Sequence, residues 1–338
     1  MKLPLLKDLN VIGKTVLLRA DLDSDFSGDN LRMKILFQIL EYLLERKANI
    51  VIIGHKGRPE GREIKNLSLK PLTERLSDVL KKDVSFLSYC DLKEFLAKDF
   101  YEIKNEILLV ENLRFWKEEE ENDAIFARSL VKSADLFVNE AFAVSHREHA
   151  SICGVAGLLP HAAGLRFTDE VSSISKVLIN PARPVLFLIS GVKKDKLKFV
   201  GQFERVADKV LIGGRLPEYL SDRVTEKKLV IARLSDDKKD ITSDSAERFE
   251  NEIKDAGTIV LSGPLGKFEN ENSALGTKRV FFAVAKSKAF KISGGGDTQK
   301  AISLFGLDDK FDWISVGGGA MLEFLGKGTL PGIQVLLN

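Results

Sequence analysis

Residues 290–300 read Phe290-Lys291-Ile292-Ser293-Gly294-Gly295-Gly296-Asp297-Thr298-Gln299-Lys300. A strand-like apolar run leads into three glycines, and a helical pattern follows at Ala301, Ile302 and Phe305. Glycine lets backbone N–H groups approach a ligand, and the following helix directs its positive end to the same place. The stretch is therefore typical of an open α/β fold and predicts a phosphate site formed by Gly294, Gly295, Gly296 and Thr298.

Two further features support an anion at this turn. A carboxylate beside a phosphate is repulsive unless a cation lies between them, so Asp297 predicts a Mg²⁺ site. A second apolar run with three glycines follows nearby, Ile314-Ser315-Val316-Gly317-Gly318-Gly319-Ala320. Two such turns so close in sequence predict one ligand held from two helix ends, the alternative being tight turns without a ligand.

The composition is that of a soluble globular protein. The chain has 338 residues, which predicts about two domains, and its net charge of +2 gives no overall basic field for nucleic acid. No apolar run is long enough to span a membrane, and the charged N-terminal segment does not read as a signal peptide. We therefore expect a cytoplasmic monomer with no nucleic-acid or membrane partner.

Strands and helices alternate along the first half, which predicts a parallel sheet covered by helices. Basic side chains recur where these strands end; they are Arg19, His55 with Arg58, Arg114, and His146 with Arg147. In open α/β sheets this edge binds ligands, and guanidinium groups pair with carboxylate and phosphate. The cluster predicts a pocket for a small polyanion, which Arg32 can join from the first helix.

A second series of strands begins after Asn180-Pro181-Ala182-Arg183-Pro184, which predicts a domain boundary. Its strand ends carry mostly glycine and lysine, as in Gly213-Gly214 and Lys193-Lys194-Asp195-Lys196. Such ends suit the phosphates of a nucleotide. The two unlike anion sites together predict phosphoryl transfer between a nucleotide and a small acid.

The chain resembles the phosphoglycerate kinase family nearly end to end. The matching runs are Leu18-Arg19-Ala20-Asp21, His55-Lys56-Gly57-Arg58-Pro59, Glu111-Asn112-Leu113-Arg114-Phe115, His146-Arg147-Glu148-His149-Ala150-Ser151, Gly263-Pro264-Leu265-Gly266, 294–298 and 317–320. The resemblance implies two Rossmann-like domains with parallel sheets, at 1–166 and 183–320. It also implies an interdomain helix at 167–182 and a tail, 321–338, that returns to the first domain.

The resemblance also implies the reaction, in which 1,3-bisphosphoglycerate and Mg·ADP give 3-phosphoglycerate and ATP, reversibly, in glycolysis. The residues implied to bind the acid are Asp21, Asp23, Arg32, His55, Arg58, Arg114 and Arg147. Those implied to bind nucleotide are Lys193, Lys196, Gly213, Gly214, Pro264, Glu269 and 294–298, with Asp297 on Mg²⁺. Arg32 and Lys193 are the implied catalytic residues, and Gly317, Gly318 and Gly319 form the implied phosphoryl-transfer turn.

Several positions depart from the family pattern. Asp23 stands where the family usually has asparagine, and a carboxylate beside an anionic substrate is unfavourable unless it is paired. Lys193 and Lys196 are one residue closer than usual, Arg215 replaces a glycine and Ser262 an asparagine. The segment between Gly214 and Thr258 is much shorter, which predicts that nucleotide binding is altered more than acid binding.

Two other functions compete with an active kinase. A kinase-derived binding protein without turnover is one, although the intact Lys193, Asp297 and arginine set argue against such decay. A dinucleotide-dependent dehydrogenase is the other, and it lacks a Gly-x-Gly-x-x-Gly turn after the first strand.

Overall fold

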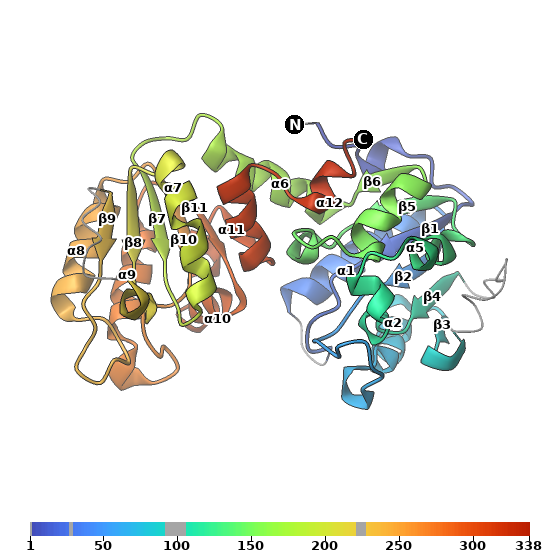
Figure 1. Cartoon of the computed structure of the whole chain (residues 1–338), viewed down its shortest axis with the longest axis horizontal. Coiled ribbons are helices and arrows are strands. Elements are labelled where there is room, and N and C mark those ends of the chain that lie inside the picture. Colours follow the sequence, from blue (N-terminus) through green and yellow to red (C-terminus); the bar gives the residue numbers. More distant parts are fainter. Residues whose placement is uncertain (1, 27–29, 92–105, 221–227) are drawn as a thin grey trace. The chain divides into compact units, whose positions relative to one another are not determined.

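The computed structural model describes residues 2–26, 30–91, 106–220 and 228–338. The chain divides into two compact units, residues 1–170 with 330–338, and residues 171–329 (Figure 1). Each unit is built on one six-stranded parallel sheet, as the alternation of strands and helices predicts. The predicted fold class is confirmed.

The first sheet has the order β3-β4-β2-β1-β5-β6. Its strands are β1 (Thr15–Arg19), β2 (Asn49–Ile53), β3 (Val84–Leu87), β4 (Ile107–Val110), β5 (Leu136–Asn139) and β6 (His161–Ala163). Strand β1 pairs with β2 on one side and with β5 on the other. The chain builds the sheet outward from β1 on the β2 side and then crosses to the β5 side, so the direction of winding reverses between β1 and β5. A ligand crevice is expected outside the carboxyl ends of these two strands.

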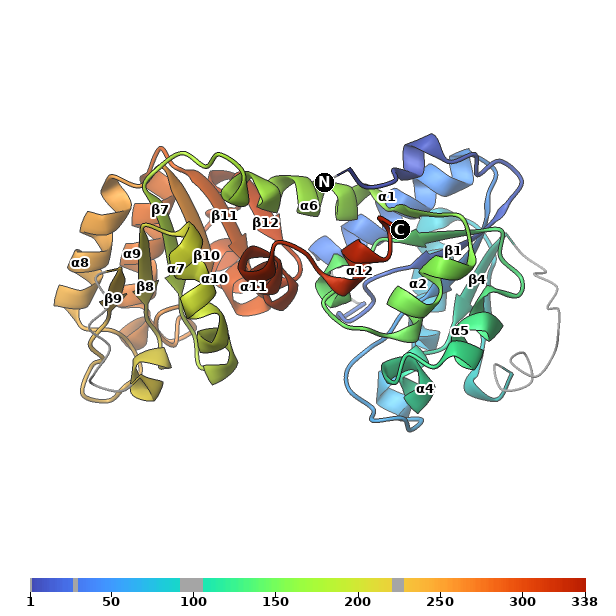
Figure 2. The same cartoon turned by 45° about the horizontal axis from the view of Figure 1, so that its top comes forward.

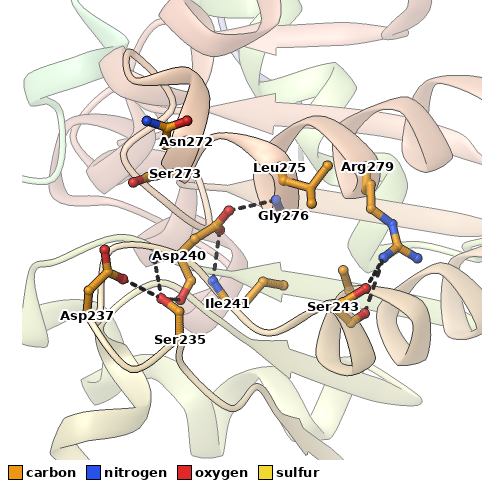
Figure 3. A pocket seen from close by; sticks show the side chains of 11 residues that line it. Ser235, Asp237, Asp240, Ile241, Ser243, Asn272, Ser273, Leu275, Gly276 and Arg279 are labelled. Atoms are coloured by element: carbon orange, nitrogen blue, oxygen red, sulfur yellow. Dashed lines mark hydrogen bonds between the residues drawn. The ribbon is translucent and has the colours of Figure 1, made fainter.

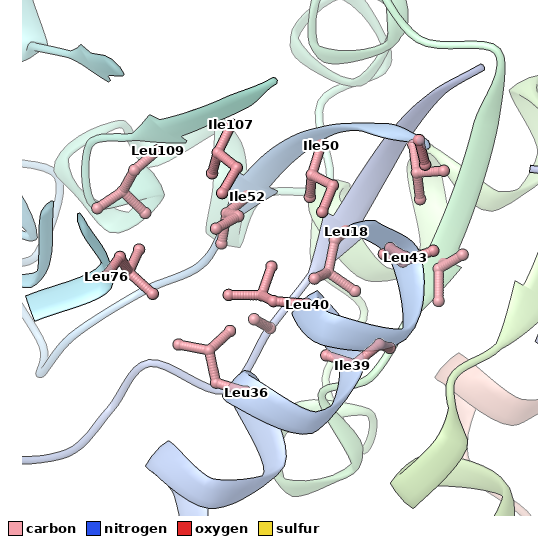
Figure 4. Packing of buried hydrophobic residues seen from close by; sticks show 14 of the residues in the cluster. Leu18, Leu36, Ile39, Leu40, Leu43, Ile50, Ile52, Leu76, Ile107 and Leu109 are labelled. Atoms are coloured by element: carbon pink, nitrogen blue, oxygen red, sulfur yellow. The ribbon is translucent and has the colours of Figure 1, made fainter. Parts of the chain in front are cut away.

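Helices α1 (Leu31–Glu45) and α2 (Lys70–Leu80) cover one face of this sheet. Leu36, Ile39, Leu40 and Leu43 recur at helical spacing on α1 and pack against Leu18, Ile50 and Ile52, with Leu76 of α2 beside them (Figure 4). Alternate strand residues such as Leu17 and Phe137 point away from this cluster and are also buried, so both sheet faces are covered. Asn30 caps α1, its side-chain oxygen accepting from the Met33 N–H. The short helices α4 (Lys117–Glu120) and α5 (Ala124–Val131) complete this part.

The second sheet has the order β12-β11-β10-β7-β8-β9. Its strands are β7 (Val185–Ile189), β8 (Lys209–Ile212), β9 (Leu229–Ile231), β10 (Thr258–Ser262), β11 (Phe290–Gly294) and β12 (Trp313–Ser315). The order reverses between β7 and β10, which makes their carboxyl ends the expected ligand crevice of this unit.

Helices cover both faces of the second sheet. Apolar residues of α8 (Ser243–Lys254), α9 (Leu275–Lys286) and α10 (Gly296–Leu304) join one buried cluster with Leu186 and Leu188 of β7. The intervening Phe187 faces the other way and packs against Phe203 of α7 (Val200–Val206), with ring centroids 4.9 Å apart. Helix α11 (Gly318–Lys327) lies beside α7 in both views (Figures 1 and 2). Within the described ranges, no helix is both long and apolar enough to cross a membrane.

Helix α6 (Leu165–Leu178) begins in the first unit and ends in the second. It begins at Leu165, two residues before the predicted 167, because the buried Glu140 carboxylate accepts the N–H groups of Arg166 and Phe167, at 2.9 and 3.0 Å. It ends at Leu178, four residues before the predicted 182. Residues 321–329 of the predicted tail lie with α11 in the second unit, and residues 330–338 lie in the first. There α12 (Pro331–Gln334) is fixed by the Gly332 N–H, which donates to the Ser145 carbonyl at 2.8 Å.

Candidate active site

Arg19 lies at the carboxyl end of β1 and is fully buried. Its Nε donates to Ser151 Oγ at 2.8 Å, one Nη donates to the Ala20 carbonyl, and the other lies 3.1 Å from His55 Nδ1. His55 follows β2 and is 1% exposed. Burial is the main cause that lowers the pKa of Arg19 to about 10, and burial with the charge of Arg19 lowers the pKa of His55 well below 6.5.

Glu119 supplies a buried negative charge near Arg19. Its carboxylate accepts from the Ser151 N–H at 2.9 Å and from Ser151 Oγ at 2.6 Å, and it lies 3.7 Å from His149 Nδ1. Burial raises the pKa of Glu119, but these partners and the Arg19 charge outweigh it and lower the pKa overall. The ionised carboxylate therefore compensates the buried guanidinium.

Arg32 is held between two predicted acid-site residues. Its Nε lies 2.9 Å from Asp21 Oδ2, and one Nη donates to the Asp23 carbonyl. The Asp23 carboxylate accepts the Gly57 N–H at 2.9 Å, so this family departure finds a backbone partner. Burial raises the pKa of Asp21, and the Arg32 charge opposes that rise.

The remaining predicted arginines differ in how they are held. Arg114 Nη1 donates to the Gly57 carbonyl at 2.8 Å, its Nε lies 3.4 Å from Glu120, and burial lowers its pKa. Arg58 and Arg147 are exposed, and within the described residues their guanidinium groups form no ion pair or hydrogen bond. The structure thus links Asp21, Arg32, Asp23 and Arg114 through Gly57 and places His55 separately beside Arg19. It leaves Arg58 and Arg147 exposed.

In the second unit the two glycine turns are in backbone contact. Gly295 has φ +112°, which side-chain-bearing residues rarely adopt, and it precedes α10. A Cβ on Gly318, at the start of α11, would lie 2.5 Å from Gly295 Cα. Gly317 precedes Gly318 and its N–H donates to Ser315 Oγ at 3.2 Å. The two helix ends therefore lie side by side, and it stays a prediction that they hold one ligand.

Lys196 lies between the strand ends where the sheet order reverses. Its Nζ donates to the Ser190 carbonyl after β7 at 2.6 Å and to the Ser262 carbonyl of β10 at 3.2 Å. Burial is the largest cause that lowers its pKa to about 8. Thr298 Oγ1 accepts the Gly263 N–H at 2.8 Å and donates to the Gly294 carbonyl, which ties this edge to the first glycine turn.

Other predicted nucleotide residues lie around the same edge. Pro264 follows β10, and its carbonyl accepts from Ser190 Oγ at 2.7 Å. Gly213 and Gly214 follow β8, and the next N–H, of Arg215, donates to the Gly191 carbonyl at 2.9 Å. The Arg215 side chain pairs with Glu218 at 2.5 Å.

Three predicted side chains of this unit are exposed: Lys193, Glu269 and Asp297. Asp297 is in the first turn of α10 and is 71% exposed, with Lys300 3.9 Å away. Elsewhere in the described chain no three His, Cys, Asp or Glu side chains gather as a metal cage.

A separate pocket of about 160 Å³ lies between the 235–243 loop and the start of α9 (Figure 3). Asp240 accepts the Gly276 N–H and the Ile241 N–H there, both at 2.8 Å, so its carboxylate caps α9. No predicted site residue lines this pocket.

A family model described as phosphoglycerate kinase matches residues 6–228 and 218–327. The chain belongs to the phosphoglycerate kinase family. Members of this family are phosphotransferases with a carboxyl group as acceptor, so the predicted enzyme class is confirmed. The predicted resemblance is confirmed with it.

Relatives and solved structures agree over the whole chain. The phosphoglycerate kinase of Leptospira biflexa is 36% identical over 100% of this chain and 99% of its own, and that of Dictyoglomus turgidum is 35% identical over 98% and 97%. The structure of phosphoglycerate kinase from Coxiella burnetii matches with a TM-score of 0.82 at 29% identity, covering 99% of both chains. That from Pyrococcus horikoshii matches with a TM-score of 0.81 at 26% identity, covering 98% of both.

This phosphoglycerate kinase family member is short. The Leptospira alignment runs over 396 positions whereas the chain has 338 residues, so at least 58 positions are gaps in this chain. The family match consists of two segments that overlap at residues 218–228, within the segment predicted to be shortened. Residues 221–227 lie outside the described part of the structure.

Arg19 belonged to the predicted cluster of basic side chains at strand ends, but the resemblance implied no role in acid binding for Arg19, Glu119 or Ser151. Arg19 gave a signal, because it stands at a strand end like the predicted arginines. No local sequence pattern pointed to Glu119 or Ser151 as partners of Arg19. Glu119 and Ser151 are 32 residues apart, and Ser151 is 132 residues from Arg19, so only the fold brings them together.

Proposed function

We propose that this chain is an active phosphoglycerate kinase that transfers a phosphoryl group reversibly between 1,3-bisphosphoglycerate and Mg·ADP. One observation carries the proposal. The glycine turns of α10 and α11 touch at Gly295 and Gly318, so two positive helix ends converge where phosphate binds. An arginine-rich site at the sheet edge of the first unit supplies a second, chemically different anion site.

The acid site would bind 3-phosphoglycerate through cations of two kinds. Arg32 and Arg114 are held by other protein groups and present guanidinium groups in fixed positions. The exposed Arg58 and Arg147 are available to pair with carboxylate or phosphate oxygens. Asp21 and Asp23 would act mainly by orienting Arg32 and the Gly57 N–H, and Asp21 is also suited to a substrate hydroxyl.

The nucleotide site fits a phosphate-bound Mg²⁺. This ion keeps several waters and needs only one or two protein carboxylates together with phosphate oxygens. Asp297 is exposed at the turn and only loosely paired, so it can serve as that carboxylate. Mg²⁺ would neutralise charge on the phosphates, which the N–H groups of both turns and Lys196 would hold. Glu269 would bind the ribose, and the edge at Gly213, Gly214 and Pro264 would face the rest of the nucleoside.

Transfer itself requires charge stabilisation rather than covalent chemistry. Arg32 from the first unit and Lys193 from the second would stabilise the transferring phosphoryl group. Lys193 is exposed and, within the described ranges, makes no ion pair, so it is free to move to a ligand.

The test is ATP formation from 1,3-bisphosphoglycerate and ADP by the purified full chain. Lys193→Ala should lower kcat on the order of 10²–10³-fold, the usual effect of removing one charge-stabilising donor. Lys198→Ala, the loss of an exposed lysine on the same segment, should leave kcat within twofold. Binding of both ligands without turnover would instead favour the kinase-derived binding protein, and a change in KM alone would reassign Lys193 to ground-state binding.

The same proposal sets the expected partners. They are the small molecules 3-phosphoglycerate and 1,3-bisphosphoglycerate, with ATP or ADP as co-substrate. A cytoplasmic location, a monomeric state and the lack of nucleic-acid partners stay predictions from the sequence.

A further inference from the structure

Four polar side chains form a continuous buried network in the first unit, here called the Arg19 network. It runs from Glu119 on α4 through Ser151 and Arg19 to His55 at the end of β2, and none of the four is more than 1% exposed. The successive heavy-atom distances are 2.6, 2.8 and 3.1 Å. All three contacts have hydrogen-bond geometry, so the network spans the sheet edge without a gap.

Each contact in the network can run in only one direction. A guanidinium has donors and no acceptor, so Arg19 donates both to Ser151 Oγ and to His55 Nδ1. The Ser151 hydroxyl has a single proton, and the ionised Glu119 can only accept it. Every group therefore has one role, and the His55 Nδ1 atom must carry a lone pair.

Nearby positive charges also favour the neutral form of the His55 ring. The groups that act on its ring electrostatically are Arg19, Arg114, His149 and Arg32, all of which disfavour a positive ring. Burial adds to this effect, so the ring is neutral at physiological pH. A neutral imidazole without a proton on Nδ1 carries it on Nε2. The described part of the chain offers no hydrogen-bond acceptor to Nε2, which leaves that N–H for a ligand.

We propose that Glu119 and Ser151 are positioning residues of the acid site, which act through Arg19 to hold His55 as a neutral Nε2–H donor to an anionic oxygen. This inference rests on the proposed role of His55 in acid binding. The opposite tautomer would direct a lone pair at the same oxygen and repel it. Glu119 and Ser151 touch no substrate in this scheme, and they set which ring nitrogen of His55 can donate.

The chain has four histidines, so ¹⁵N-histidine labelling of the full-length protein gives a spectrum that can be assigned. His55→Gln identifies the His55 signals by their loss. In the ligand-free wild type we expect His55 to have an unprotonated Nδ1 and a protonated Nε2, unchanged between pH 6 and pH 8. Nδ1 protonated, or a ring that charges in this range, would overturn the proposal whether or not any variant folds.

Ser151→Ala removes the acceptor of Arg19 Nε and should give His55 signals averaged between the two tautomers. It should also raise KM for 3-phosphoglycerate about tenfold at nearly constant kcat, as expected for one lost hydrogen bond. Ser129→Ala is the matched control, because Ser129 is a buried serine of the same unit whose Oγ donates only to Ile125 of its own helix at 2.9 Å. The control should change neither measurement.

The two proposals can fail separately. Unchanged His55 signals and unchanged KM in Ser151→Ala would overturn the positioning role while leaving acid binding by His55 intact. If His55→Gln leaves KM for 3-phosphoglycerate unchanged, the acid-site assignment fails, even where the spectra show the expected tautomer.

Discussion

The two proposed anion sites are constructed in opposite ways. In the first unit several cations are side chains held inside the protein, as Arg19 is fully buried and Arg114 is 7% exposed, although Arg58 and Arg147 are exposed. In the second unit the proposed phosphate donors are backbone N–H groups of the two glycine turns. The charged side chains Lys193 and Asp297 are exposed there. A compact acid with fixed charges suits a rigid set of guanidinium groups. A nucleotide with a hydrated metal suits N–H donors together with mobile side chains.

This contrast predicts where single substitutions act. In the first unit the removal of a charge also disturbs its buried partners, whereas in the second unit the addition of a side chain to a turn is more damaging than the loss of most exposed charges. Four measurements test the contrast, from the largest expected effect to the smallest.

Arg32→Ala should lower kcat on the order of 10²–10³-fold, because its charge acts mainly on the phosphoryl group during transfer. The substitution also leaves the Asp21 carboxylate without its cation, 2.9 Å away in the wild type. Steady-state kinetics in both directions measure the effect, with Arg46→Ala at the other end of α1 as control. A kcat within a few-fold of wild type would contradict the catalytic role.

Gly318→Ala should raise KM for Mg·ADP about a hundredfold, since a displacement near 1 Å in a binding turn commonly costs that much. Its Cβ would lie 2.5 Å from Gly295 Cα, so the two turns must separate. Gly201→Ala on α7 is a matched control, because nothing lies within 4 Å of its Cβ position and Gly201 has no assigned role. Equal KM values for the two variants would show that contact between the turns is not needed for nucleotide binding.

The Lys196 ammonium should give nucleotide binding a pH dependence. Burial lowers its pKa to about 8, so above this pH the ligand-free enzyme loses the charge that pairs with phosphate. We expect KM for Mg·ADP to rise about fivefold from pH 8 to pH 9. Lys196→Arg keeps its charge throughout and should remove this rise. A wild-type KM that is flat up to pH 9.5 would exclude titration of Lys196 as a factor in binding.

The shortened second unit should discriminate weakly between purine bases. Specific rejection of a base needs directed hydrogen bonds to its edge, and the shortened segment leaves fewer walls to supply them. We expect kcat/KM for ADP and GDP to agree within about tenfold, which is roughly 1.4 kcal/mol. The measurement uses saturating 1,3-bisphosphoglycerate. A thousandfold preference for ADP would mean that the remaining residues form a selective base pocket.

Local patterns were sufficient to predict two parallel sheets, both glycine turns and the arginines at strand ends, but not the edge strands β3 and β6. Alternating apolar strands and helices determine a doubly wound sheet, and such a sheet places strand ends along one edge. The same patterns carried no information on Glu119, because a buried carboxylate that compensates a distant arginine has no periodicity. They also did not predict the start of α6 at Leu165, which depends on Glu140 accepting from two backbone N–H groups.

Residues 330–338 belong to the first unit, although the ribosome makes them after the whole of the second. The Ser145 carbonyl stays without the Gly332 N–H until α12 has been synthesised, so the first unit emerges with one edge unfinished. A stalled or prematurely terminated chain therefore differs from a finished one in its N-terminal half as well as at its end. Completion of that half is coupled to the synthesis of residues 330–338.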